Sequence, residues 1–218
     1  MITKVVKKML LLIKGSFSAF SNNKIGNSGG IRFAAKWEPQ NRKARRLKRI
    51  LSDKSSLFSE QLSEGNLHSR IRMSLLYGAA FSSNKLVIGT SNKSELLIGY
   101  WTKWGDGGTD FLPIGDLYKS QVFKLGKILD VPSEILDRKP TAELWPDQTD
   151  EEEFGFSYTE LDNVLIELEK FNSSTLISEK TGVSIEKIDK IKGMIQTSIH
   201  KRVFPPVCKI GFRTVGLD

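Results

Sequence analysis

Cysteine is almost absent from the sequence, and the one that occurs, Cys208, lies near the C-terminal end. A single cysteine excludes a framework of disulfides within the chain and a cysteine-rich metal site. Long hydrophobic runs are absent too, since no apolar stretch approaches the roughly 18 residues that span a bilayer. The opening MITKVVKKMLLLIKG has an apolar run only from position 9 to 13, too short for the central region of a signal peptide. These absences predict a protein of the reducing cytoplasm, away from membranes.

Acidic residues are scarce in the first quarter of the chain. Residues 1–56 contain 14 lysines and arginines but only two acids, a net charge of +12, whereas the remaining 162 residues contain 19 basic and 23 acidic side chains, a net charge of −4. The boundary predicts a basic, atypical segment over 1–56 and one globular domain over 57–218. A basic segment is compatible with contact to nucleic acid or anionic lipid. It lacks the aromatic interleaving and the recognisable fold of a nucleic-acid-binding module, so we do not assign nucleic acid as a partner.

The rest of the chain alternates between elements of two kinds. A short apolar run over 85–88 is typical of a buried strand, and Ser91 or Asn92 is placed to cap the helix that follows. Long helices and few, short strands predict a three-layer α/β architecture. Apolar residues at helical spacing predict helices over 67–82, 93–100, 118–129, 158–171, 174–181 and 184–197, with a shorter turn or helix after Pro132.

The loop after this strand is unusually long and polar. Residues 89–110 read GTSNKSELLIGYWTKWGDGGTD, where glycines let the backbone approach a ligand closely. Glu95 follows the strand at the distance expected of a carboxylate that ligates Mg²⁺ bound to phosphates, and Lys103 can pair with phosphate. By itself, a lone Glu here is more often an exposed helix residue, and the Lys103 stretch is compatible with a polar loop in which Gly107 and Gly108 make the turn. The residues alone therefore predict a soluble α/β domain with a nucleotide site.

Six blocks in order carry a more specific resemblance. They are GNLHSRIRM at 65–73, VIGTSNKSE at 87–95, GYWTKWGDGGTD at 99–110, PIGDLYKSQV at 113–122, KPTAELWPDQTDEEEFGFSY at 139–158 and HKR at 200–202. In these blocks the chain resembles the ammonia-dependent NAD synthetases of archaeal type, within the N-type ATP pyrophosphatase superfamily. The resemblance covers about 60–206 and implies a Rossmann-like three-layer adenine-nucleotide-hydrolase fold with a parallel sheet, incomplete in its N-terminal part.

The resemblance also implies an activity. Members of this family amidate deamido-NAD with ammonia and ATP, giving NAD, AMP and pyrophosphate through a nicotinate adenylate, with Mg²⁺. They are homodimers that bind deamido-NAD at the dimer interface, where the helix over 67–82 would pack. The glutamine-using enzymes carry a further amidase domain with a cysteine nucleophile, so free ammonia is the expected nitrogen source here.

Site residues follow from the resemblance, position by position. No catalytic side chain is implied, because positioning and charge neutralisation carry the reaction. The implied contacts are Ser28, Gly29, Gly30, Thr90, Lys119 and Thr141 for ATP, Glu95 for Mg²⁺, and Arg70, Lys103, Asp110, His200 and Lys201 for deamido-NAD.

The N-terminal third departs from the family pattern. The family's phosphate loop reads SGGxDS after a hydrophobic strand, and here the only counterpart is NSGGIRF, in which Arg32 and Phe33 stand in place of Asp and Ser. The 35 residues from Gly30 to Gly65 are fewer than the family's strand–helix units need. Three hypotheses therefore stand: a working synthetase with an unusual N-terminal part, a catalytically impaired synthetase-like protein that binds nucleotide, and a nucleic-acid-binding module that uses the basic segment, for which the sequence shows no recognisable fold.

Overall fold

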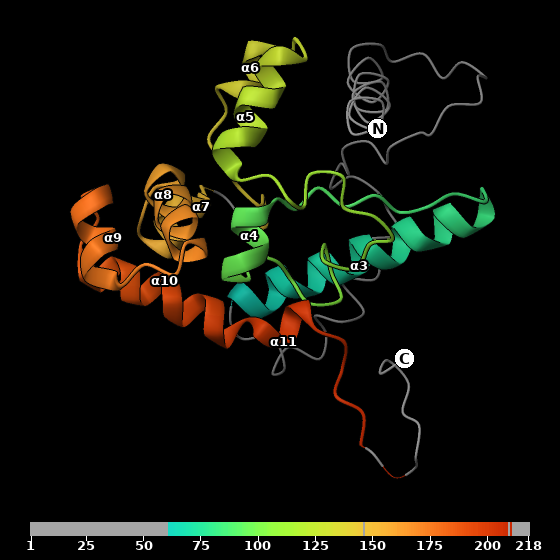
Figure 1. The fold of residues 1–218 in the computed structure, drawn as a ribbon. Helices are drawn as coiled ribbons and strands as arrows, with labels where there is room; N and C mark the ends of the chain where they lie inside the picture. Colours follow the sequence, from blue (N-terminus) through green and yellow to red (C-terminus); the bar gives the residue numbers. More distant parts are fainter. Residues whose placement is uncertain (1–60, 146, 209, 211–218) are drawn as a thin grey trace, which may run out of the picture.

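The computed structural model describes residues 61–145, 147–208 and 210. Ser28, Gly29 and Gly30 of the predicted phosphate loop, and all of the basic segment, lie outside the described residues. The helices, labelled as in Figure 1, are α3 (Gln61–Ser82), α4 (Lys93–Ile98), α5 (Lys119–Ile128), α6 (Ser133–Leu136), α7 (Asp150–Phe154), α8 (Tyr158–Glu169), α9 (Ser174–Thr181), α10 (Ile185–Thr197) and α11 (Ile199–Arg202).

The core is built by α8, α9 and α10 with α4 beside them (Figure 1). On α8, Leu161, Val164 and Leu165 recur at helical spacing and are at most 1% exposed. Ile177 of α9 and Ile188 of α10 are fully buried against the same cluster. Burial of these side chains supplies the hydrophobic stabilisation of this part of the chain. It also holds α8 in a fixed position against α9 and α10.

Helix α4 occupies a central place and ends at a close contact. Gly99 caps it with φ of 75°, a left-handed conformation that favours glycine. A Cβ at this position would lie 2.2 Å from Ser198 Cβ, so no other residue fits without displacing α10 and α11. The glycine therefore brings the C-terminal end of α4 against the HKR segment that follows Ser198.

The predicted strand over 85–88 is wrong as a regular strand. Among the described residues, β-structure is limited to an isolated parallel bridge between Ile88 and Phe111. Gly89 N donates to Phe111 O and Asp110 N donates to Val87 O, both at 2.9 Å. These two bonds tie the ends of the 89–110 loop together but do not extend into a ladder, and a strand is defined only by such pairing.

The predicted helices are confirmed, with ends that differ by a few residues. The helix predicted from 67 begins by Gln61, and the one predicted to 171 ends at Glu169. Helices α7 and α11 were not predicted. None of the helices within the described residues is long and apolar enough to cross a membrane.

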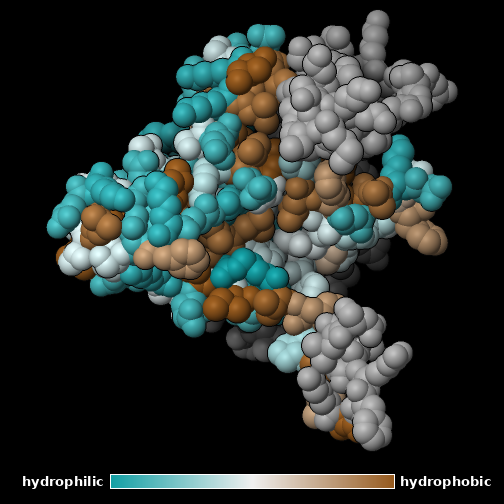
Figure 2. All heavy atoms as spheres, viewed as in Figure 1, coloured by the Kyte–Doolittle hydropathy of each residue, from teal (hydrophilic) through white to brown (hydrophobic). Residues whose placement is uncertain are grey.

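Helix α3 stands apart from this core. Of its 22 residues only Gly65 and Ser69 are buried, although it carries apolar residues along its length. Figure 2 shows hydrophobic residues over α5, α6 and the band toward α3, while the face over α8 and α9 is mainly hydrophilic. Large apolar side chains left exposed in this region include Phe81, Leu86 and Ile128. Exposed apolar side chains also occur beside the α8–α10 core, for example Phe171 after α8 and Ile185 at the start of α10.

Candidate nucleotide site

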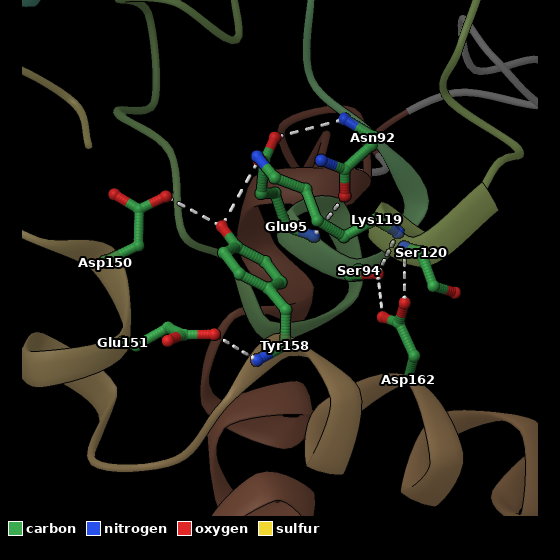
Figure 3. Close-up of polar contacts among 9 residues, drawn as sticks. All are labelled: Asn92, Ser94, Glu95, Lys119, Ser120, Asp150, Glu151, Tyr158 and Asp162. Carbon is green, nitrogen blue, oxygen red and sulfur yellow. Dashed lines mark hydrogen bonds and ion pairs between the residues drawn. The ribbon is translucent and has the colours of Figure 1, made fainter. Parts of the chain in front are cut away.

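The first predicted site residues lie where α4 and α5 begin (Figure 3). Asn92 caps α4, since its side chain accepts from Glu95 N at 3.0 Å while Asn92 N donates to Glu95 Oε2 at 3.1 Å. This capping box holds the Glu95 carboxylate against the first turn. Its other oxygen, Oε1, accepts from Lys119 Nζ at 2.9 Å, and both side chains are mostly buried. Glu95 and Lys119, predicted from separate motifs, therefore meet in one ion pair.

Tyr158 joins this ion pair to a second acid (Figure 3). Its hydroxyl donates to Asp150 Oδ2 at 2.8 Å and lies 3.3 Å from Glu95 Oε1. Burial, together with the two carboxylates, raises the pKa of Tyr158 far above its ordinary value, so the hydroxyl stays protonated. Burial also raises the pKa of Asp150, and the Tyr158 hydrogen bond offsets this only in part. We call these four residues, Glu95, Lys119, Asp150 and Tyr158, the Glu95 cluster.

Asp162 fixes the backbone beneath the cluster. It is 2% exposed, on the otherwise apolar face of α8. Its Oδ2 accepts from Ser120 N at 2.7 Å and its Oδ1 accepts from the Ser94 hydroxyl. Ser94 Oγ accepts in turn from Lys119 N at 2.9 Å. One buried carboxylate thus ties the first turns of α4 and α5 to α8, and this sets where Glu95 and Lys119 stand.

The Glu95 cluster fits Mg²⁺ only as part of a nucleotide complex. Mg²⁺ in nucleotide sites is held by one or two carboxylates together with phosphate oxygens and water. Glu95 supplies one such carboxylate, and its oxygens already attract the Lys119 ammonium. Within the described residues no group of three or more acidic, histidine or cysteine side chains could hold a metal by itself. The donor set is therefore suited to Mg²⁺ that arrives with phosphates.

Three other predicted residues gather at the opposite end of α4. Arg70 Nε donates to Lys103 O at 3.2 Å, and Lys103 Nζ donates to His200 O at 2.6 Å and lies 3.4 Å from His200 Nδ1. They come from α3, the 89–110 loop and α11, so residues far apart in the sequence form one exposed basic group. We call Arg70, Lys103 and His200 the Lys103 cluster. Its charge suits an anion such as a phosphate.

Lys201, predicted beside His200, has different surroundings. Its Nζ donates to Gly99 O at 2.6 Å and to Trp101 O at 2.7 Å, and burial lowers its pKa. Its neighbour Arg202, which the motif did not mark as a contact, donates to the carbonyls of Leu96 and Leu97 at 3.1 and 2.6 Å. Arg202 thus binds the last turn of α4, whose carbonyl groups carry partial negative charge, and Lys201 binds the cap residue Gly99 and Trp101 just beyond it.

The remaining predicted contacts lie elsewhere. Asp110 accepts from Val87 N at 2.7 Å and from Tyr77 Oη at 3.0 Å, so it closes the base of the 89–110 loop against α3. Thr90 is exposed, at the start of this loop. Thr141 Oγ1 accepts from Glu143 N at 3.1 Å. The structure brings together Glu95 with Lys119, and Arg70 with Lys103 and His200, but does not place Thr90, Thr141 or Asp110 in direct contact with either cluster.

Sequence reasoning missed Asp150, Tyr158 and Asp162 as parts of the site. Asp162 carried a signal, because a carboxylate between Leu161 and Val164 on a buried helical face requires partners. Asp150 and Tyr158 stand in the 139–158 motif, but nothing local marks them as paired. Their contact depends on how α7 and α8 pack against α4.

The family model described as NAD synthase matches residues 35–205. Two curated relatives are NH(3)-dependent NAD(+) synthetases. The one from Archaeoglobus fulgidus is 50% identical over 162 residues, which is 74% of this chain and 62% of the relative. The one from Sulfurisphaera tokodaii is 44% identical over 172 residues, which is 78% of this chain and 62% of the relative. The chain therefore spans about six-tenths of the length of the curated relatives it matches.

Solved structures give the same likeness. The NMN synthetase from Francisella tularensis superposes with a TM-score of 0.65 at 39% identity, over 76% of this chain and 64% of that one. The NH3-dependent NAD synthetase from Campylobacter jejuni, in complex with the nitrate ion, gives a TM-score of 0.60 at 34% identity, over 76% and 62%. The family predicted from the six sequence blocks is confirmed, and with it the adenine-nucleotide-hydrolase fold for the part of the chain that matches.

Proposed function

Because the chain belongs to the NAD synthase family, we propose that it acts in the ATP-dependent amidation of deamido-NAD with ammonia, which yields NAD, AMP and pyrophosphate. The observation that carries this proposal is the Glu95–Lys119 ion pair, 2.9 Å between Oε1 and Nζ. Both residues stand in family motifs, and both are held by caps and by Asp162 rather than by flexible loops. Such pre-positioned charges are what a reaction between two anionic nucleotides requires.

Within the Glu95 cluster, the Glu95–Lys119 ion pair serves the ATP side. In the absence of nucleotide, Lys119 and Glu95 neutralise each other. With Mg²⁺-ATP present, Glu95 would supply a carboxylate to hold the metal and Lys119 would pair with a phosphate oxygen, so each side chain would keep an opposite charge beside it. Bound Mg²⁺ supplies neutralisation of phosphate charge at the α-phosphate that the nicotinate carboxylate attacks. Thr90 and Thr141 are further proposed ATP contacts, on the ground of their places in the family motifs.

The Lys103 cluster serves the deamido-NAD side. Arg70 and Lys103 offer positive charge to the dinucleotide's phosphates, and His200 lies within reach of the same anion. Asp110 can accept hydrogen bonds from ribose hydroxyls. We propose an indirect role for Lys201. Its bonds to Gly99 O and Trp101 O hold the HKR segment in place.

We propose a homodimer in the cytoplasm, with α3 at the two-fold interface. This helix has 22 residues of which two are buried, and Leu67, Ile71 and Leu75 line a shallow groove along one side. An apolar groove on a long, poorly covered helix is suited to a second copy of the same helix. The division into a basic segment over 1–56 and a synthetase domain over 57–218 also remains our proposal. The impaired alternative has no support in the comparisons, all of which are with synthetases.

The test is an assay of the purified chain with deamido-NAD, Mg²⁺-ATP and ammonium chloride, in which NAD and AMP are both measured. Equal amounts of NAD and AMP are expected. Glu95→Gln should reduce the rate by about 10²–10³-fold, the typical cost of one well-placed electrostatic group. ATP cleavage without NAD, or no turnover of either nucleotide, would instead favour the impaired alternative.

A second substrate deserves a parallel assay. One of the two solved neighbours is an NMN synthetase, and it superposes with the higher TM-score of the two. Nicotinate mononucleotide should therefore be offered at the same concentrations as deamido-NAD. The larger kcat/KM identifies the physiological acceptor, and we expect it for deamido-NAD because the curated relatives are NAD synthetases.

A further inference from the structure

We propose that Asp150 Oδ1 is the acceptor that holds the ammonium ion, the nitrogen source of the amidation proposed above, beside the Glu95–Lys119 pair. The inference rests on that proposed function. It assigns the third substrate to a residue that neither the motifs nor the predicted contacts single out, and it can be tested apart from the reaction.

The proposal rests on one buried carboxylate oxygen, Asp150 Oδ1, which lacks a hydrogen-bond partner among the described residues. Asp150 is 4% exposed, and its Oδ2 accepts from Tyr158. Its Oδ1 is fully buried and has no hydrogen-bond partner among the described residues. Figure 3 shows one oxygen directed at the Tyr158 hydroxyl and the other directed away from it. Buried carboxylates are nearly always paired, so this oxygen requires a donor that the described protein does not supply.

The nearby donors are engaged elsewhere. Lys119 Nζ donates to Glu95 Oε1 at 2.9 Å. The Tyr100 hydroxyl, close enough to Asp150 to affect its pKa, donates to Glu153 Oε2 at 2.5 Å. Glu95 and Glu153 therefore hold the short bonds of this cation and this hydroxyl, and Tyr100 adds only a side-chain hydrogen-bond contribution that lowers the pKa of Asp150. The surroundings of Asp150 therefore keep an excess of negative charge, which favours a cation over a neutral ligand.

The surroundings favour ammonium over a divalent metal. A metal requires several oxygen, nitrogen or sulfur ligands, and no set of three or more acidic, histidine or cysteine groups is arranged for one in the described residues. Ammonium needs an acceptor and tolerates aromatic neighbours, because ring faces attract cations. Tyr100, Phe154 and Tyr158 pack as one aromatic group next to Asp150, with centroids 5.2 and 5.3 Å from Phe154.

The position also suits the nucleophile. Asp150 and Glu95 are linked through a single hydroxyl, Tyr158 Oη, which is 2.8 and 3.3 Å from their carboxylate oxygens. An ammonium ion at Asp150 would therefore lie next to the residues proposed to bind Mg²⁺-ATP. The adenylate forms there, and ammonia must reach its acyl carbon.

A binding test needs no catalysis. Thermal unfolding is followed in increasing NH₄Cl, with NaCl added to keep the ionic strength constant. Wild type should gain roughly 2–5 °C in Tm when ammonium is in about tenfold excess over its Kd. Asp150→Asn, which keeps the size and an oxygen for Tyr158, should show no gain. Glu152→Gln, which removes an exposed carboxylate from the same short helix, is the matched control and should respond as wild type does.

A kinetic test separates this site from the ATP side. The KM for ammonium should rise about tenfold to a hundredfold in Asp150→Asn, which corresponds to loss of one hydrogen bond to a charged group. Deamido-NAD-dependent exchange between ATP and pyrophosphate, which needs no ammonia, should stay within about threefold of wild type, a small effect on this scale.

The possible outcomes are distinct. An unchanged KM for ammonium and an unchanged Tm response in Asp150→Asn overturn the inference, and indicate that a water molecule satisfies Oδ1. Loss of exchange with a retained ammonium response also overturns it, since Asp150 then belongs to the Mg²⁺-ATP site. If wild type shows no exchange but has an ammonium response that Asp150→Asn abolishes, the site stands while the proposed function fails.

Discussion

Lys201 of the HKR segment and Lys103 of the 89–110 segment have different surroundings in the described structure. Lys201 donates to two backbone carbonyls, Gly99 O and Trp101 O, and burial lowers its pKa. Lys103 belongs to the exposed basic group with Arg70 and His200. Lys201 is therefore held by two backbone carbonyls, whereas Lys103 has one such bond, to His200 O, and lies in the basic group that we propose for deamido-NAD.

This difference predicts a split in the effects of two substitutions. Lys201→Ala removes two bonds to backbone carbonyls, of which Gly99 O keeps Trp101 N as a donor and Trp101 O loses its bond to Lys201, and should lower the free energy of unfolding by about 1–3 kcal/mol. Lys103→Ala removes one bond to a backbone carbonyl, His200 O, from a half-buried side chain, so it should lower this free energy by less, at most about 1 kcal/mol, and should also weaken binding of deamido-NAD. Urea unfolding and ligand titration measure the two effects. Equal losses of stability in both variants would contradict the assignment.

Tyr158 gives a second prediction at this scale. Tyr158→Phe removes the hydroxyl that donates to Asp150 Oδ2 and should destabilise the protein by about 1–3 kcal/mol at neutral pH. Asp150 already has a raised pKa, and losing this bond raises it further. A carboxyl whose folded pKa is raised costs stability above that pKa, and the cost disappears as the group becomes protonated. The difference from wild type should therefore shrink on acidification, which urea unfolding at several pH values can measure.

At the residue scale, the sequence predicted half of the Glu95 cluster. Glu95 and Lys119 stand in motifs with charged residue types that suit phosphate and metal, so the residues themselves suggested their role. Asp150 and Tyr158 acquire theirs only from burial and from each other. A raised pKa or an unpaired oxygen is a property of packing, and no local pattern in the sequence encodes it.

At the scale of elements, helix ends are fixed by caps that the sequence does display. Ser157 caps α8 and accepts from Glu160 N at 3.1 Å, while Ser157 N donates to Glu160 Oε2 at 2.8 Å. Glu160 Oε1 also accepts from Lys187 of α10 at 2.6 Å. The capping box thus links the start of α8 to a second core helix, and it serves both local and tertiary structure.

Glu160 belongs both to the capping box of α8 and to an ion pair with Lys187. The stability that it contributes should therefore depend on pH. Hydrogen bonds, first from Lys187 and then from Ser157 N, lower the pKa of Glu160 below its ordinary 4.5. A lowered folded pKa means that the stabilisation is present above 4.5 and is lost as the pH falls through the folded pKa. Glu160→Gln should therefore be less stable than wild type at pH 7 and approach it in acid. Ser173→Ala, at the cap of α9, should lose about 1 kcal/mol without that pH dependence; urea unfolding compares them.

Helices were predictable where strands were not. An α-helix closes its hydrogen bonds within one segment, so apolar spacing and caps over 158–169 or 185–197 suffice to locate it. A strand depends on a partner elsewhere in the chain, and residues 85–88 form only the bridge from Ile88 to Phe111 in the described structure. The short helices α7 and α11 were missed because four or five residues are too few to show a period.

At the scale of the whole molecule, α4 separates the two halves of the site. Glu95 lies in its first turn with the ATP-side residues, and its last turn is bound by the HKR segment near the basic group (Figure 1). Six residues of helix measure about 9 Å. Two nucleotides bound at the two ends would thus be held a short, fixed distance apart, as a reaction between them requires.

The remaining question at this scale is what covers α3. We predict a second copy, and two glycines in comparable settings can test it. Gly78 of α3 and Gly193 of α10 are both exposed, and a Cβ added at either would meet nothing within 4 Å. In an isolated chain, alanine at each position should stabilise its helix by roughly 0.5–1 kcal/mol. At a two-fold interface, however, glycine beside Ala79 and Ala80 lets the partner backbone approach closely, and an added methyl would hinder it.

The two substitutions should therefore diverge. Gly193→Ala should raise Tm at every protein concentration, because α10 faces the core of its own chain. Gly78→Ala should raise the Kd of dimerisation measured by sedimentation, and Gly78→Leu should raise it further, since a larger side chain keeps the two α3 helices apart. Their Tm should rise only at dilutions where wild type is already monomeric. If both glycine variants behave alike, and wild type sediments as a monomer at micromolar concentration, α3 is not the dimer interface.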